Sequence, residues 1–215
     1  AAEAAVDETW STLGDEGFVV VRSDAPEGPT TTVLAETGHG LLHGWFHLVR
    51  EGAMAQEGPG AQGARGPQAR STATMPGTTS HEPGGVSVEV HRPAHDLRVL
   101  DHWDNVSVHP VMGQVERGYS DGSLFYDDGH LRPDLSKVRQ YARLLAASGV
   151  NRVVLNNVNV GRREAELLTT HLDDVVALAD AFRPYGVRVH LSVSFASPVV
   201  LGGLATADPA DPGVQ

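Results

Sequence analysis

The chain has 215 residues, 40% of them apolar, and a formal net charge of −11, because 27 Asp and Glu residues outnumber 16 Lys and Arg residues. This length suits one large domain or two small ones, and the acidic charge argues against binding to nucleic-acid phosphates. The absence of cysteine excludes disulfides, thiolate zinc sites and cysteine nucleophiles. No apolar run is long enough for a membrane span, and residues 1–10 do not resemble a signal peptide, so we expect a cytoplasmic location with no membrane contact.

The first part of the sequence predicts the end of a small α+β domain, which we assign to residues 1–52. Residues 17–22 (GFVVVR) and 30–36 (TTTVLAE) are typical of short strands, and turn residues separate them. Apolar residues then recur at helical spacing and predict a helix from about residue 38 to residue 50.

Residues 53–90 are assigned to a Gly/Pro-rich linker or long loop, because small and polar residues replace the large apolar ones that a core needs. The sequence GPGAQG at residues 58–63 matches the spacing of a dinucleotide-binding loop. No predicted strand precedes it and no predicted helix follows it, so we interpret the match as chance.

Residues 91–215 alternate between strand and helix patterns. Strands are predicted at 97–103, 150–156 and 187–194, and helices at about 133–149 and 164–185. This order implies parallel strands with right-handed crossovers, as in a doubly wound sheet or a (β/α)₈ TIM barrel. We favour the first three βα units of a barrel, because polar clusters follow all three strands and strand ends build the active site there.

Three βα units cannot close an eight-stranded barrel. We therefore expect the inward side chains of Val153, Leu155, Val189 and Leu191 to lack partners. We also expect that these 215 residues alone are not a stable, active enzyme.

The three polar clusters read HWDN (102–105), NNVN (156–159) and SFAS (194–197). Asparagine is depleted in strands, so three asparagines after an apolar run suggest that their amides face a polar ligand. Trp103 is either a core residue or a platform for a sugar ring. Glu116 and Arg117, in the sequence ERGY, are either a surface ion pair or part of a substrate-facing loop. The candidate binding residues are Trp103, Asp104, Asn105, Glu116, Arg117, Asn156, Asn157, Val158, Asn159, Ser194, Phe195 and Ser197.

Histidines provide a weaker alternative. His39, His43 and His47 have helical spacing and could share a face that binds zinc. The sequence places no acidic third ligand nearby, so we favour core or surface roles for them. A metal-dependent hydrolase that uses His91, His95 or His102 is a further alternative.

Several longer segments resemble one enzyme family. HWDN, ERGY, YARLLAASGVNRVVLNNVN, LADAFRPYGVRVHLSVSFASP and LGGLATADPADP are similar to the α-glucuronidases of glycoside hydrolase family 67, and EGFVVV and HGLLHGWFHLVR resemble the end of that family's N-terminal domain. The resemblance implies an inverting enzyme of xylan degradation that removes 4-O-methyl-D-glucuronic acid from xylo-oligosaccharides. It also implies no metal or cofactor, and a homodimer formed through a C-terminal region. Trp103 and Val158 match the residues that enclose the 4-O-methyl group in the family.

The sequence departs from the family pattern in the longer span between HWDN and ERGY and in the long linker. It also stops after the third predicted strand, whereas the family's catalytic acid and base follow later strands. We therefore expect no catalytic residue within this segment and assign only substrate-binding roles. The alternative function is a non-catalytic carbohydrate-binding module.

Overall fold

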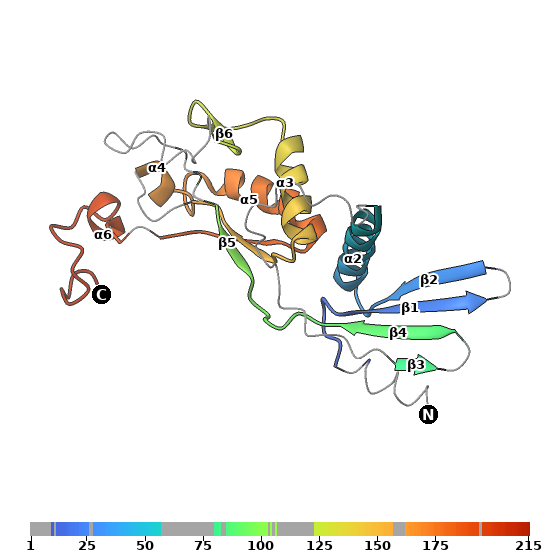
Figure 1. Ribbon diagram of the computed structural model, residues 1–215. Helices are drawn as coiled ribbons and strands as arrows, with labels where there is room; N and C mark the ends of the chain where they lie inside the picture. Colours follow the sequence, from blue (N-terminus) through green and yellow to red (C-terminus); the bar gives the residue numbers. More distant parts are fainter. Residues whose placement is uncertain are drawn as a thin grey trace, which may run out of the picture. The chain divides into compact units, whose positions relative to one another are not determined.

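The computed structural model describes residues 10, 12–25, 28–56, 80–82, 85–102, 104, 106, 123–156, 162–193 and 195–215. The chain divides into two compact units (Figure 1). The first unit comprises Ala1–Asp96 with Ala147–Gly149, and the second comprises Leu97–Ala146 with Val150–Gln215. Each unit is described separately below.

The first unit is an antiparallel sheet with a helix on one face (Figure 1). Its strands lie in the order β2-β1-β4-β3, and the helix α2 packs against β1 and β2. The elements are β1 (Phe18–Ala25), β2 (Gly28–Leu34), α2 (Gly38–Gln56), β3 (Ser80–Glu82) and β4 (Val86–His91). The two predicted strands and the predicted helix of this region are therefore confirmed.

The helix α2 approaches the sheet closely because a glycine faces it. A Cβ atom added to Gly44 would lie 2.3 Å from Cγ1 of Val33 and 3.1 Å from the ring of Phe18, which no side chain tolerates. Phe46 is buried, whereas its neighbour Trp45 is 59% exposed.

The structure corrects the assignment of residues 53–90 to a linker at both ends of that range. The helix α2 continues to Gln56, and β3 and β4 occupy residues 80–82 and 86–91. β4 pairs with β1 from Val86 to His91 and so lies inside the sheet. Its alternating sequence VSVEV is a strand signal that the neighbouring Gly- and Pro-rich composition obscured. The rest of the predicted linker, residues 57–79, lies outside the described residues.

The second unit contains a parallel sheet in the order β5-β8-β9. Helices connect these strands, as the sequence predicts, and a two-stranded ribbon precedes the first helix (Figure 1). The elements are β5 (Val99–Asp101), β6 (Tyr126–Asp127), β7 (His130–Leu131), α3 (Ser136–Ala147), β8 (Arg152–Val154), α4 (Arg162–Ala165), α5 (Leu172–Phe182), η2 (Arg183–Tyr185), β9 (Arg188–His190) and α6 (Ser197–Val200).

The core of the second unit lies between this sheet and its helices. Phe125 and Phe182 are fully buried and pack edge to face, with ring centroids 6.2 Å apart. Val153 and Leu155 on and after β8 are also fully buried. The expectation that these two side chains would lack partners is therefore wrong, because the neighbouring strands and helices already cover them.

The predicted helix at 164–185 is divided in the structure. α4 ends at Ala165, turns follow, and α5 begins at Leu172. The hydroxyl of Thr169 donates to the carbonyl of Glu166, which competes with helical hydrogen bonding. Two aspartates then occupy the first turn of α5, where negative charge is favoured. Leu168, which lies in the turns between the two helices, is 60% exposed.

The hairpin of β6 and β7 was not predicted. Its two central residues, Asp128 and Gly129, both have positive φ angles, of 46° and 75°. This is the two-residue turn that Asp-Gly favours, so the sequence DDGH carried a usable signal. Arg163 of α4 donates to the Gly129 carbonyl at 3.1 Å and thereby ties the hairpin to the unit.

The described fold is thus a mixed α/β structure. Adjacent parallel strands joined by helices are common to barrels and doubly wound sheets, so closure into a barrel stays a prediction. Among the described residues, no helix combines the length and apolar character that crossing a membrane requires.

Candidate functional site

The candidate site lies at the carboxyl ends of β5, β8 and β9. The segments that follow the three strands continue the hydrogen bonding of the sheet. The N–H of His102 donates to the Val154 carbonyl, the N–H of Asp104 to the Leu155 carbonyl, and the N–H of Leu155 to the His190 carbonyl. Residues that directly follow the three strands are therefore neighbours. In open and closed parallel sheets this is the edge where ligands bind.

Asp104 is the buried carboxylate of this edge, with only 1% of its surface exposed. Its Oδ2 accepts the backbone N–H groups of Leu124 at 2.8 Å and Phe125 at 3.2 Å. The same oxygen lies 3.2 Å from Nε2 of His102. Asp104 therefore fixes the segment before β6 against the end of β5.

His102 extends this network into α3. Its Nδ1 lies 2.9 Å from the hydroxyl of Tyr141, and its ring packs on Phe125 with centroids 4.5 Å apart. A neutral His102 with its proton on Nε2 donates to Asp104 and accepts from Tyr141. Burial first, and the Asp104 charge second, raise the pKa of Tyr141 to about 12, which keeps this hydroxyl a donor.

The second oxygen of Asp104 is the unusual atom of the site. Oδ1 is buried and has no hydrogen-bond partner among the described residues. Most buried polar atoms in proteins are hydrogen-bonded, so an unpartnered carboxylate oxygen needs an explanation. A hydroxyl donor from a bound molecule would satisfy it.

Asn156 joins the ends of β8 and β9. Its side-chain Nδ2 donates to the Ser192 carbonyl, and its Oδ1 accepts the Ser192 N–H, both at 3.0 Å. The amide thus reproduces one step of sheet pairing after the strands have ended. This explains why a strand-like run ends in an asparagine that is 1% exposed.

The other predicted site residues fall into two groups. Phe195 is 85% exposed, and Ser197 begins α6 and lines a small pocket described next. The remaining predicted residues lie outside the described residues: Trp103, Asn105, Glu116, Arg117, Asn157, Val158, Asn159 and Ser194. Of the predicted set, the structure therefore places Asp104 and Asn156 together at the strand ends.

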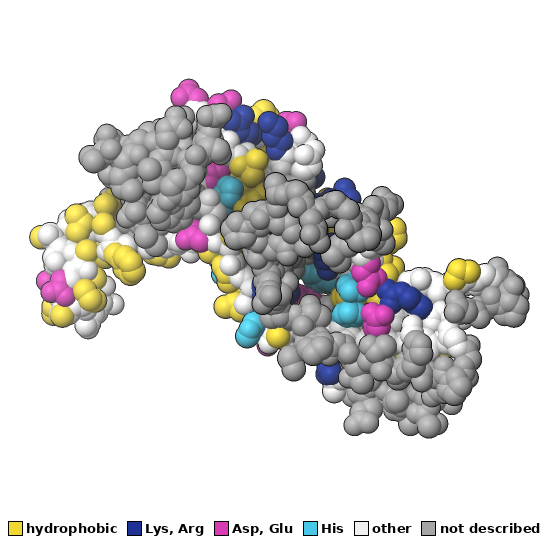
Figure 2. Space-filling model, in the orientation of Figure 1, with side chains coloured by type: hydrophobic (Ala, Val, Ile, Leu, Met, Phe, Trp, Pro, Cys, Tyr) yellow, Lys and Arg dark blue, Asp and Glu magenta, His cyan; other side chains and the backbone are white. Residues whose placement is uncertain are grey.

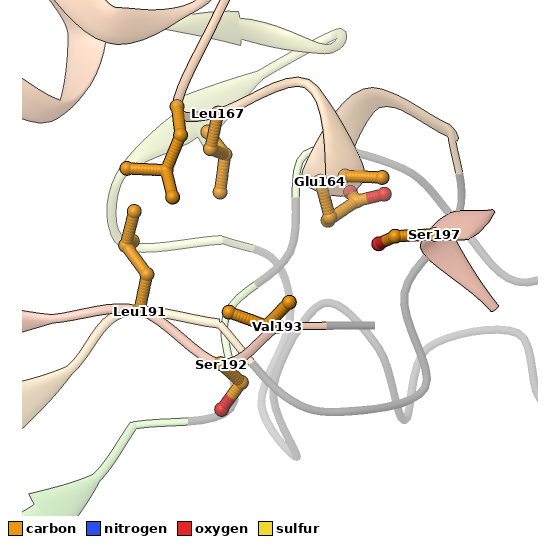
Figure 3. Close-up of a pocket in the computed structure, with 8 residues that line it drawn as sticks. Glu164, Leu167, Leu191, Ser192, Val193 and Ser197 are labelled. Atoms are coloured by element: carbon orange, nitrogen blue, oxygen red, sulfur yellow. The ribbon is translucent and has the colours of Figure 1, made fainter. Parts of the chain in front are cut away.

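A small pocket opens beside the end of β9 (Figure 3). Its polar lining includes Glu164, whose carboxylate points toward Ser197, while Leu167 and Leu191 form the other side (Figure 3). Glu164 is 3% exposed and was not predicted as a site residue. A glutamate inside an amphipathic helix pattern is normally solvated, so the sequence carried no clear signal for it.

Comparison with known proteins identifies the family. Residues 80–215 match the sequence pattern of the "Glycosyl hydrolase family 67 middle domain". The chain belongs to glycosyl hydrolase family 67. The resemblance that the sequence motifs predicted is therefore confirmed.

Relatives in this family support the same assignment. The chain is 48% identical over 199 residues to "Alpha-glucuronidase A" of Emericella nidulans, which is 93% of this chain and 20% of the relative. It is 37% identical over 203 residues to "Probable alpha-glucuronidase A" of Aspergillus oryzae, covering 94% and 20%. It is 45% identical over 187 residues to the protein of that name in Neosartorya fischeri, covering 87% and 18%. The chain thus spans about a fifth of the length of these relatives.

Proposed function

We propose that this chain is part of an inverting α-glucuronidase that removes 4-O-methyl-D-glucuronic acid from xylo-oligosaccharides during xylan degradation. Membership of the glycosyl hydrolase family and the names of its relatives support this activity. The parallel order of β5, β8 and β9 supports the proposal that these strands begin a (β/α)₈ barrel.

The observation that carries the binding role is the unpartnered Oδ1 of Asp104 at the strand ends. A sugar offers several hydroxyl groups, and a hydroxyl that donates to a carboxylate makes a strong, short hydrogen bond. The exposed ring of Phe195, which follows β9 in the chain, adds an apolar face of the kind that packs on sugar rings. Asp104 is accordingly assigned as a substrate-binding residue.

Asp104 does not serve as the acid or base in this proposal. Inverting hydrolysis needs two carboxyl groups about 6.5–9.5 Å apart, with a water between one of them and the sugar. One oxygen of Asp104 is already bound to two backbone N–H groups. The acid and base are therefore proposed to come from residues beyond this segment, while the segment positions the uronic acid.

The test compares two conservative variants of the complete natural protein. Asp104→Asn keeps an acceptor for Leu124 and Phe125 but replaces the unpartnered oxygen with an NH₂ group. Asp101→Asn changes an exposed carboxylate at the end of β5, three residues before Asp104, and is the matched control. We expect Asp104→Asn to lower kcat/KM for glucuronic acid release by about tenfold or more, mainly through KM, and Asp101→Asn to leave it unchanged.

Thermal melts of both variants separate binding from folding. An Asp104→Asn enzyme that melts like the wild type but has raised KM supports the proposal. Equal KM values for all three proteins would show that Oδ1 does not meet substrate. A natural protein that binds glucuronoxylan oligosaccharides and releases no glucuronic acid would instead indicate a carbohydrate-binding module.

A further inference from the structure

A cluster of imidazole and carboxylate groups lies between α2 and the sheet in the first unit. His47 and Glu51 are four residues apart on α2, and Glu89 and His91 are two residues apart on β4. These spacings place each pair on one face of its element. Figure 2 shows histidine, acidic and basic side chains gathered in this part of the first unit.

The distances in this cluster are close to those of a metal site. Nε2 of His91 lies 3.4 Å from Oε2 of Glu89, and Nε2 of His47 lies 3.2 Å from Oε1 of Glu51. Ligand atoms of His47, Glu89 and His91 all lie within 4.8 Å of one another. Tetrahedral zinc with bonds of about 2.0–2.2 Å holds its ligand atoms about 3.4 Å apart. Small side-chain rotations therefore suffice to close the site.

The carboxylates are already oriented toward the histidines. Arg22 of β1 bonds Oε1 of Glu89 and Oε2 of Glu51, which are the oxygens that face away from the imidazoles. Each carboxylate thus presents its other oxygen to a histidine. Outer hydrogen bonds of this kind fix metal ligands in place. Two carboxylates against one guanidinium also leave the cluster with a net negative charge when both imidazoles are neutral.

The two imidazole rings are held by packing as well. The Phe18 ring stacks on His91, with centroids 4.8 Å apart and an interplanar angle of 14°. The rings of His47 and His91 are 4.2 Å apart. Their nitrogens are therefore confined to the same small volume next to an apolar wall.

One atom of the cluster lacks the partner that burial demands. Nε2 of His47 is buried and has no hydrogen-bond partner among the described residues, since its approach to Glu51 lacks hydrogen-bond geometry. A bound cation would accept the lone pair of this nitrogen and so take the place of the missing hydrogen bond.

We propose that His47, Glu89 and His91 bind a divalent transition-metal ion of the zinc type, with Glu51 as the fourth ligand. Two imidazoles and two carboxylates are a donor set that suits such ions. The ion joins α2 to β4 and stabilises the first unit, and it takes no part in the proposed hydrolysis. The helical histidine pattern alone did not indicate this site, because only His47 of that pattern faces the cluster and Glu89 comes from a distant strand.

The experiment is a zinc titration of the complete natural protein, purified without a polyhistidine tag and stripped with a chelator. Zn²⁺ is added in competition with a chromophoric chelator, and Co²⁺ is added separately to record its visible absorption. The variants are His47→Ala, His91→Ala and Glu89→Gln, and His39→Ala on the exposed part of the same helix is the control. Melting temperatures are recorded with and without Zn²⁺.

We expect one tightly bound Zn²⁺ per chain, a tetrahedral Co²⁺ spectrum, and a higher Tm with metal. His47→Ala and His91→Ala should weaken binding by roughly tenfold or more, and His39→Ala should not. Glu89→Gln keeps the side-chain shape, so it decides the question if a histidine variant does not fold. The proposal would be overturned if the wild type does not bind Zn²⁺. It would also be overturned if Glu89→Gln and the histidine variants bind Zn²⁺ as tightly as the wild type.

Discussion

The two units of the protein use buried polar side chains in different ways. In the second unit, Asp104 and Asn156 bind backbone groups and hold strand ends and loops together. In the first unit, charged and imidazole side chains pair with one another between a helix and a sheet. They are Arg22, His47, Glu51, Glu89 and His91. The arrangement in the second unit satisfies backbone groups and leaves one carboxylate oxygen, Oδ1 of Asp104, without a partner among the described residues. The arrangement in the first unit leaves potential ligand atoms facing one another, and such an arrangement can bind a cation.

The difference predicts which changes damage the fold. A side chain bound to backbone leaves unsatisfied N–H and C=O groups when it is removed, and those groups cannot find other partners. A side chain bound to other side chains leaves groups that can rotate toward water. Of the three predictions below, those on Asn156 and Tyr141 test this contrast and the one on Gly44 tests the packing of the first unit; they run from the largest expected effect to the smallest.

Asn156→Ala should destabilise the protein by about 2–4 kcal/mol, because the N–H and C=O groups of Ser192 both lose their partner. Ser192→Ala is the matched control, since those bonds use only the Ser192 backbone. Urea unfolding, together with amide exchange at β9, measures both effects. Equal stability of the two variants would show that the amide does not hold the strand ends together.

Gly44→Ala should destabilise the first unit by about 1–3 kcal/mol, because the added methyl group overlaps Val33 and pushes α2 from the sheet. Gly52→Ala on the same helix has open space around its Cβ position, so it should be neutral or slightly stabilising. Amide exchange of α2 and β1 measures the change. Restored protection in Gly44→Ala combined with Val33→Ala would confirm overlap as the cause, whereas protection as in the wild type in Gly44→Ala alone would contradict the close approach.

Tyr141 should make stability fall in alkaline solution. Its pKa is raised to about 12 in the folded protein, chiefly by burial, against an ordinary value of about 10. The unfolded chain therefore loses this proton first, and the stabilisation present below pH 10 is lost as the pH rises from about 10 to about 12. Tyr141→Phe should show a weaker decline over that range. Identical pH profiles of the two proteins would contradict the raised pKa.

The sequence predicted the elements whose pattern is local and periodic. The strands β1, β2, β5, β8 and β9 and the helices α2 and α3 follow from apolar spacing and from the glycines after the helices. The β6–β7 hairpin was missed although Asp128-Gly129 is a strong turn signal. The break between α4 and α5 was missed because one apolar stripe ran through it.

The site residues show the limits of local patterns more clearly. Asp104 and Asn156 were predicted as site residues because polar residues directly follow apolar runs, and the structure places both at the strand ends, while their binding role stays a prediction. Their partners Leu124, Phe125 and Ser192 could not be found, because backbone groups carry no sequence signal. In the first unit, Glu51 was an acidic signal that the sequence analysis overlooked, because it follows His47 by four residues on the same helix. Glu89 could not be found in this way, because it reaches His47 only through the pairing of β4 with β1.

The most direct measurement of the central proposal is a crystal structure of the natural protein with bound 4-O-methyl-D-glucuronic acid. We expect a sugar hydroxyl at about 2.5–3.0 Å from Oδ1 of Asp104, with Leu124 and Phe125 still donating to Oδ2. A sugar bound away from the ends of β5, β8 and β9, or bound there with Oδ1 still unpartnered, would contradict the account.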